Sequence, residues 1–439
     1  MVILIKVVQL LVSLSILVIF HEFGHFISAK IFKTRVEKFY LFFNPWFSLF
    51  KIKRGETEYG IGWLPLGGYV KISGMIDESM DKEQMKQPPQ PWEFRSKPAW
   101  QRLIIMLGGV TVNILLAIAI YICILFAWGD TYLPTSEVKY GITVDSLGYQ
   151  MGLRNGDRIL SIDNNVIEDF ADIPKQLIFE QAKTIQVVRD GQNTEVTIPD
   201  GFINKLIRSN SVSFITVRYP FEAGKFVLGS VAEKAGMKLN DRIIGINDSL
   251  FPYFDEFRMA LQHYRNQNVS ILVLRGSDTI HIPMTVPPEG KIGVYHKELS
   301  AYFKLKEKSY SILTAIPAGF TRTFEKTADY LKGLRLLFSQ EKAYESVGGF
   351  ITIGSLFPDA WDWQTFWSWT AFLSIMLAVL NVLPIPALDG GHVMFLLYEM
   401  IFRRKPSEKF MEYAQITGMV LLFGLLIFAN LNDIIKLFR

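Results

Sequence analysis

The sequence predicts a polytopic α-helical membrane protein with four transmembrane helices, a membrane-associated β-hairpin or sheet and two inserted extracytoplasmic α+β domains. Half of its 439 residues are hydrophobic and its mean hydropathy is +0.22, yet 20% of them are charged. This composition is too apolar for an ordinary soluble protein and too charged for a chain buried entirely in lipid. Four long apolar segments and a repeat in the polar middle of the chain complete the prediction.

Four apolar segments are expected to span the membrane. They run over about residues 2–29, 103–128, 367–383 and 414–428. A fifth segment, 311–338, mixes apolar and charged residues at helical spacing. It is expected to form an amphipathic helix on or beside the bilayer rather than a span.

Lysine and arginine predict the orientation of these segments. They gather near both ends of the loop 30–102 and in the loop 403–409. Because basic loops remain in the cytoplasm, both loops are predicted to be cytoplasmic. Residues of about 130–305 and both termini are then expected on the opposite side of the membrane.

The charge and the cysteine count exclude other features. The net charge is +4 and the chain has no block of lysine and arginine, so a nucleic-acid partner is not expected. Cys123 is the only cysteine, so no intrachain disulfide can form. The polar domains must therefore be stabilised by their own hydrophobic cores.

The first apolar segment ends in the motif His21-Glu22-Phe23-Gly24-His25. On a helix this spacing places two imidazoles one turn apart on one face, as a tetrahedral Zn²⁺ requires, with a carboxylate beside them to take a proton from water. Ionisable groups at membrane depth cost roughly 2.5–3.5 kcal/mol each, so they are rarely kept without a use. The alternative is a helix end whose polar residues merely lie at the membrane interface.

A catalytic zinc takes three protein ligands and leaves a place for water. Asp389 is the proposed third ligand, because Pro384 and Pro386 break the third apolar segment and allow the chain to fold back towards the metal. The position of Asp389 suits a helix N-cap equally well. His392, three residues further on, is a rival ligand.

Two asparagines interrupt apolar segments. Asn381 either bonds a neighbouring helix, at roughly 0.6 kcal/mol in membranes, or bonds the substrate backbone or a developing oxyanion. Asn113 has the same two interpretations, and the structural one is favoured for it.

The polar region between the second and third apolar segments contains a repeat. Gly152–Asp163 recurs as Gly236–Asn247, 84 residues later, and each copy reads as a turn, an apolar strand and an Asp/Asn-rich turn. This pattern resembles tandem PDZ domains, which receive a chain terminus or a strand in a groove. The alternative is a generic β-repeat with no binding role. The elements expected after each turn are helices near 170–180 and 254–263 and strands over 185–189 and 270–275.

The first basic loop contains a segment, 56–74, with strand-like alternation around Pro65 and the pair Gly67-Gly68. This pattern predicts a β-hairpin. Irregular backbone at membrane depth is tolerated only against protein or a wet cavity, so the hairpin is expected to line the site and to offer an open edge to an extended substrate. Gly67, Gly68 and Tyr69 are therefore candidate substrate-binding residues.

These motifs together resemble the site-2 protease family of M50 zinc metalloproteases, over essentially the whole chain. The resemblance rests on the H-E-x-x-H motif, on N-x-x-P-x-P-x-L-D-G-G from Asn381 to Gly391, and on the paired PDZ-like modules. It extends to Pro65–Val70 and Phe94–Pro98. Two departures are Leu107-Gly108-Gly109, where the family often has Ala-Gly-Pro, and Gly348-Gly349, where it often has Gly-Pro.

The resemblance implies an intramembrane zinc metalloendopeptidase with one Zn²⁺. His21, His25 and Asp389 would be the metal ligands and Glu22 the catalytic carboxylate. Asn381 would position the substrate, and His392 would be a neighbour of the ligands. The expected substrates are transmembrane segments of single-span proteins, of the anti-sigma factor type after a first extracytoplasmic cleavage, and remnant signal peptides.

The same resemblance implies a multi-pass protein of the bacterial inner membrane that acts in regulated proteolysis and stress signalling. The PDZ domains would be periplasmic and would act as a size filter, and the active site would face the cytoplasm. The expected divisions are 1–30 (first span), 31–99 (cytoplasmic loop), 100–129 (second span), 130–205 and 206–290 (the two PDZ domains), 291–360 (linker and amphipathic helix), 361–400 (third span) and 401–439 (fourth span).

Two other functions fit parts of the sequence. One is a non-catalytic membrane scaffold whose PDZ pair binds partners and whose metal is structural. The other is a transporter with an ion site at the bilayer midplane. Glu22 argues against the scaffold, because a structural zinc needs four ligands and no base. The sequence shows no inverted repeat that would favour a transporter.

Overall fold

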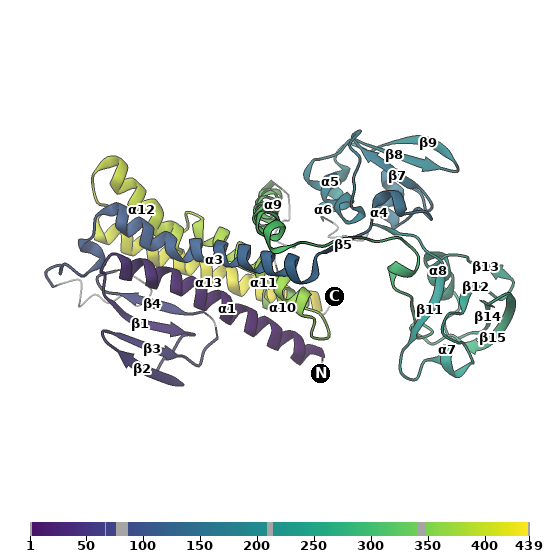
Figure 1. The fold of residues 1–439 in the computed structure, drawn as a ribbon, viewed down its shortest axis with the longest axis horizontal. Coiled ribbons are helices and arrows are strands. Elements are labelled where there is room, and N and C mark those ends of the chain that lie inside the picture. The colour runs from purple at the N-terminus through teal and green to yellow at the C-terminus, as the bar shows by residue number, and fades with distance from the viewer. Residues whose placement is uncertain (1, 66, 76–86, 209–213, 340–347, 438–439) are drawn as a thin grey trace. The chain divides into compact units, whose positions relative to one another are not determined.

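The computed structural model describes residues 2–65, 67–75, 87–208, 214–339 and 348–437, so that Leu66, within the segment 56–74, lies outside the described residues. The chain forms two compact units (Figure 1). The first contains residues 1–129 and 309–439, and the second contains residues 130–308. Each unit has its own core and is described separately.

The first unit is a helical bundle with a small sheet. Among the described residues, four helices are long and apolar enough to cross a membrane, as the sequence predicts. Their bounds are Val2–Ile31 (α1), Ala99–Trp128 (α3), Trp363–Val382 (α11) and Glu408–Leu437 (α13). The shorter or more polar helices are Phe94–Ser96 (η1), Ile312–Ser339 (α9), Phe350–Ser355 (α10) and Asp389–Phe402 (α12).

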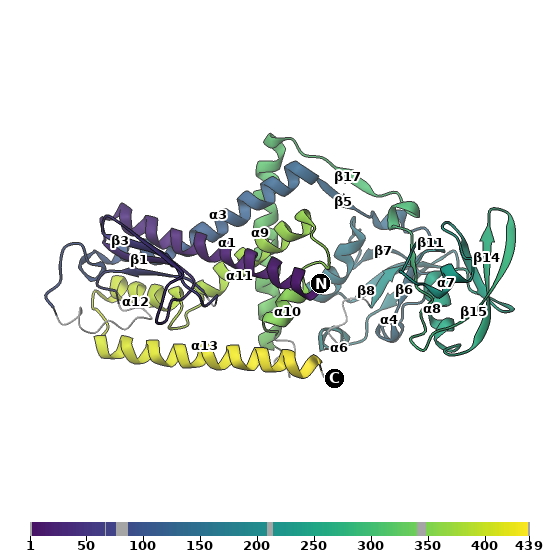
Figure 2. The ribbon, with the colours of Figure 1, turned by 90° about the horizontal axis from the view of Figure 1, so that it is seen from below.

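Helix α3 is the central element of the bundle, in contact with α1, α9, α11 and α12. It crosses α1 where Gly24 faces Gly108, and a Cβ on either glycine would clash with the carbonyl oxygen of the other. Small residues allow such close backbone approach, which drives helix association in lipid. The start of α1 and the end of α13 lie at the same end of this unit (Figures 1 and 2).

The sheet of the first unit corrects the predicted hairpin. Its strand order is β2-β3-β1-β4, so the two strands of segment 56–74, β3 and β4, do not pair with each other. Strand β1 lies between them, parallel to β3 and antiparallel to β4. The hairpin lies one strand earlier, between β2 and β3, at Gly55, whose φ is +58°. The strand bounds are Val36–Leu41 (β1), Phe50–Arg54 (β2), Thr57–Ile61 (β3) and Tyr69–Ile72 (β4).

The misassignment has a physical reason. Alternation of apolar and polar side chains indicates which residues form strands, because the period of two residues is a property of a single strand. It does not report the partner, and here the connection from β3 to β4 passes around β1. The correction leaves β4 at one edge of the sheet, where it contacts α1.

The described residues of the second unit form two large hydrophobic cores in succession, one from Ile142 to Ile215 and one from Phe221 to Ile292, and a smaller cluster of Leu133, Val138, Tyr302 and Phe303. Its helices are Thr135–Glu137 (η2), Ser146–Met151 (α4), Phe170–Asp172 (η3), Ile173–Phe179 (α5), Phe202–Arg208 (α6), Val231–Lys234 (α7), Phe254–Gln262 (α8) and Leu299–Ala301 (η4). The helices predicted near 170–180 and 254–263 are among them. The first core includes Ile215 of strand β10 (Ile215–Val217), which pairs with β6 (Ile142–Val144).

The described strands of the second unit form four sheets. The sheets are β10-β6, β7-β8-β9, β15-β14-β12-β11-β16 with β13 beside β12, and β17-β5. Their bounds are Asp130–Tyr132 (β5), Ile142–Val144 (β6), Arg158–Ile162 (β7), Thr184–Arg189 (β8), Gln192–Thr197 (β9), Ile215–Val217 (β10), Phe221–Phe226 (β11), Arg242–Ile246 (β12), Ser249–Leu250 (β13), Asn268–Arg275 (β14), Asp278–Thr285 (β15), Val294–His296 (β16) and Lys306–Lys308 (β17).

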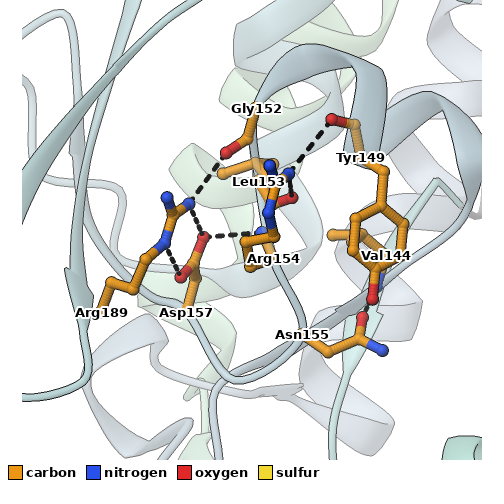
Figure 3. Close-up of polar contacts among 8 residues, drawn as sticks. All are labelled: Val144, Tyr149, Gly152, Leu153, Arg154, Asn155, Asp157 and Arg189. Atoms are coloured by element: carbon orange, nitrogen blue, oxygen red, sulfur yellow. Dashed lines mark hydrogen bonds and ion pairs between the residues drawn. The ribbon is translucent and has the colours of Figure 1, made fainter.

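The sequence repeat corresponds to a repeated hydrogen-bond network. In the first copy the buried Asp157 carboxylate accepts two bonds from the Arg189 guanidinium, at 2.8 and 2.7 Å, and one from the Arg154 backbone N–H. Arg189 also donates to the Gly152 carbonyl, 2.8 Å away (Figure 3). These bonds tie the turn before β7 to the end of β8.

The second copy forms the same network with its own residues. Arg275 donates two bonds of 2.7 Å to Asp241 and one of 3.0 Å to the Gly236 carbonyl, and the Lys238 backbone N–H donates to Asp241. Burial raises the pKa of the Asp241 carboxyl, but the bonds from Arg275 and Lys238 outweigh it and hold this pKa below its ordinary value. The network therefore stabilises the second core most when Asp241 is charged.

Replacing Asp241 with Asn should destabilise the second core by about 1.5–3 kcal/mol, the typical contribution of a hydrogen bond to a charged group. Because the pKa of Asp241 is lowered on folding, its contribution is fully present above about pH 4 and is lost as the pH falls below that value. Hydrogen exchange of the β12 and β14 amides measures both effects. Asp248→Asn is the control, because Asp248 is exposed in the next turn; equal exchange in the two variants would contradict the prediction.

Candidate metal centre

Three side chains from two distant helices converge inside the bundle. His21 and His25 lie one turn apart on α1, with their ring centroids 4.8 Å apart. Asp389 is the first residue of α12. Helix α11 ends at Val382, before Pro384 and Pro386, and the non-helical stretch that follows brings Asp389 to the imidazoles. The N-cap position is held by Leu388, so Asp389 is not the N-cap of α12.

The geometry of the three donor atoms fits a zinc ion. His21 Nε2, His25 Nε2 and Asp389 Oδ2 form a triangle with all three sides equal to 3.3 Å. A tetrahedral site with bonds of about 2.0–2.1 Å places its donor atoms about 3.3 Å apart. Asp389 Oδ2 is also buried and, apart from the two imidazoles, has no hydrogen-bond donor among the described residues. When both Nε2 atoms are unprotonated this carboxylate oxygen has no donor, and a cation at the centre of the triangle would compensate for the cost.

The second nitrogen of each imidazole has its own partner, which leaves Nε2 free for the metal. His25 Nδ1 lies 2.9 Å from the Ile105 carbonyl oxygen, to which it can donate. His21 Nδ1 lies 3.2 Å from the Asn113 amide, whose Oδ1 has no partner among the described residues. A half-turn of this amide would place Oδ1 against His21 Nδ1–H, the tautomer that metal binding through Nε2 requires.

Asn113 thus has a more specific role than the sequence predicts. It is an interhelical hydrogen-bonding residue, as expected, but its partner on α1 is one of the candidate ligands. The sequence does not reveal this partner, because two positions 92 residues apart carry no local signal of their contact.

Gly109 is a second residue whose role only the structure reveals. A Cβ at this position on α3 would lie 2.7 Å from His21 Cε1 and would overlap His25 Nε2. Its backbone therefore forms a wall of the metal centre. Gly108-Gly109 is part of a departure from the pattern of the resembling family. The contact with the imidazoles explains why a residue without a side chain occupies position 109.

Glu22 lies beside the triangle and against the sheet. Its carboxylate accepts a hydrogen bond from the Val70 backbone N–H on strand β4. Gly68 comes close to the same side chain, since a Cβ there would lie 3.3 Å from Glu22 Cγ and 2.6 Å from Val18 Cγ1. The edge strand thus passes directly beside the candidate catalytic carboxylate.

Of the other predicted site residues, Asn381 lies at the metal centre, whereas Tyr69 and Gly67 pack within the sheet. Asn381 is buried, and its Nδ2 lies 3.4 Å from His21 Nε2. The Tyr69 side chain stacks on Tyr40 and donates to Asn44, so it belongs to the sheet, and Gly67 packs beside Phe43.

His392 is not in the donor triangle. Among the described residues, the group of metal-ligating side chains within 4.8 Å of one another contains only His21, His25 and Asp389. His392 lines a separate pocket together with Phe395 and Glu399.

Comparison with known proteins agrees with this geometry. The profile of Peptidase family M50 matches residues 9–425. The chain is 29% identical over 432 residues to "Putative zinc metalloprotease Cj1068" of Campylobacter jejuni, which covers 97% of this chain and 92% of that protein. It is 28% identical over 448 residues to "Regulator of sigma E protease" of Haemophilus influenzae, at 97% and 98% coverage. It is 28% identical over 430 residues to "Putative zinc metalloprotease CPE1693" of Clostridium perfringens, at 97% of both chains.

Gly109→Ala should lower zinc affinity at least about 10-fold, because the added methyl group displaces both imidazoles, and perturbing the support of metal ligands typically costs 10–100-fold. Chelator titration with zinc measured by mass spectrometry tests this. Gly424→Ala on α13 is the control, because no atom lies within 4 Å of a Cβ there. A zinc affinity equal to that of the wild type in the Gly109 variant would show that the Gly109 backbone does not form a wall of the metal centre.

Asn113→Ala should lower zinc affinity by about 10–100-fold through loss of the bond that orients His21. Ser374→Ala is the matched control, because Ser374 donates to the Asn113 backbone carbonyl at 2.8 Å and tests helix packing alone. The same chelator titration applies. An equal loss in both variants would show that Asn113 acts only through packing.

Proposed function

Because this chain belongs to peptidase family M50, we propose that it is an intramembrane zinc metalloprotease of the regulator-of-sigma-E type, which cleaves transmembrane segments of single-span membrane proteins. One observation supports this most strongly. The three zinc donors, with Glu22 beside them, lie within a bundle of helices long and apolar enough to cross a membrane.

His21, His25 and Asp389 would hold the metal, and the zinc would supply the Lewis acidity that makes water nucleophilic near neutral pH. Glu22 takes the proton from the attacking water and returns it to the leaving amine. Asn113 and the Ile105 carbonyl keep the two imidazoles in one tautomer and orientation. The described residues offer three metal ligands at this site, so a fourth coordination position is left for water or substrate. A structural zinc site, in contrast, has all four positions filled by protein ligands.

A transmembrane helix must unwind before it can be cleaved, because its backbone groups are bonded within the helix. Strand β4 offers these groups a partner, since it is the edge of its sheet and runs past Glu22. An extended substrate pairing along β4 would present its scissile carbonyl to the metal centre. Gly68 would allow close approach, and the Asn381 amide would bond the carbonyl oxygen.

The repeated modules of the second unit would be PDZ domains, in the periplasm of a bacterium with the chain in its inner membrane. In the chain these modules lie between α3 and α11, two helices long enough to span the membrane. The basic loops 30–102 and 403–409, which are expected in the cytoplasm, lie outside this stretch of the chain. The modules would act as a filter that excludes bulky substrates. The substrates would then be anti-sigma factors already trimmed by another protease, in line with the name of the Haemophilus influenzae relative, and remnant signal peptides.

Glu22→Gln should retain zinc and lower the rate of cleavage of a model transmembrane peptide at least about 100-fold, the lower range for loss of a general acid–base. Cleavage in proteoliposomes and zinc content by mass spectrometry give the two readouts. Glu56→Gln is the control, because Glu56 is exposed in the turn between β2 and β3. Undiminished cleavage would refute the role of Glu22, and wild-type protein that never cleaves would favour the scaffold.

A further inference from the structure

A cavity of about 450 Å³ lies in the first unit, apart from the donor triangle. It is bounded by the start of α3, one face of α12 and the start of α13, and its lining includes Phe94, Arg102, Phe395, Glu399, Lys405 and Gln415. We propose that this cavity, called here the α12–α13 pocket, binds the phosphate-bearing headgroup of an anionic phospholipid.

Gln415 points to a ligand. Its side chain lines the pocket and is only 5% exposed, yet it has no hydrogen-bond partner among the described residues. The Gln415 amide is therefore available to a ligand in the pocket. A phosphate or glycerol oxygen there would accept a hydrogen bond from Gln415 Nε2.

The charge of the lining favours an anion. Arg102 is held by Glu399, at 2.6 Å, and donates to the Lys97 carbonyl, so its position is fixed. Arg95 is held in the same way by Glu93, at 2.6 Å. Lys405 also lines the pocket and has no ion-pair partner in the part of the chain that the structure describes. Arg102 and Arg95 are thus each paired with a carboxylate, and Lys405 is the lining cation that remains available to a ligand phosphate.

The remaining lining and the location favour a lipid over a soluble anion. Apolar side chains of Phe94, Phe395, Leu396 and Met411 form much of the wall and suit the upper part of an acyl chain. The pocket lies where the spanning helices α3 and α13 begin, the depth at which headgroups meet a bundle. Basic pockets between helix ends are a recognised kind of site for anionic headgroups.

The test is native mass spectrometry of the full-length protein in a neutral detergent, with phosphatidylglycerol or phosphatidylcholine added. Wild type should retain phosphatidylglycerol preferentially. Lys405→Gln and Gln415→Leu should each weaken this retention about fivefold, the loss expected for one ion pair or hydrogen bond. Arg404→Gln removes the same charge from the same loop outside the pocket and should have no effect.

Each contrary outcome overturns the proposal. Equal retention of the two lipids would show that no anionic headgroup is recognised. Equal effects of Lys405→Gln and Arg404→Gln would show that only net charge matters. Displacement of phosphatidylglycerol by inorganic phosphate or by an acidic peptide would assign the pocket to a soluble ligand. Unchanged thermal unfolding of Gln415→Leu verifies that this variant is folded.

Discussion

The close approach of α1 and α3 is the constraint on which the metal centre depends. Gly24 and Gly108 let the two backbones touch, and one residue further along α3 Gly109 lies against the imidazoles of His21 and His25. At this separation α3 can also supply the Ile105 carbonyl and the Asn113 amide to the outer nitrogens of the two rings. In lipid, where apolar surfaces gain little from meeting each other, such small-residue contacts carry much of the association.

The same geometry explains how charged groups are tolerated among apolar helices. A carboxylate and two imidazoles would be costly there if each were isolated. Here the donor atoms of Asp389 and the two histidines face one another at 3.3 Å, and Glu22 is bonded by the backbone of β4. Each of these polar groups therefore has a partner, which is either another group of the site or the zinc ion that proteins of this family use.

Two kinds of element surround this centre, and they contribute differently. The helices fix the ligands, whereas the sheet places β4, its edge strand among the described residues, beside Glu22. The edge could not be located from the alternation in residues 56–74, which indicated the strands but suggested the wrong partner for β4. Pairing of β4 with β1 is a long-range contact, and only the packing of β1 and β4 on α1 decides it.

The sequence by itself determined the four long apolar helices, the amphipathic helix, the repeat and the motif residues, because periodicity, apolar length and short spacings are local properties. His21 and His25 had to share a face once their segment was helical. Asp389 could equally have been a cap, and its contact with them is decided by the tertiary structure alone. The same holds for Asn113, Gly109 and the α12–α13 pocket, since each depends on distances between helices that no local pattern encodes.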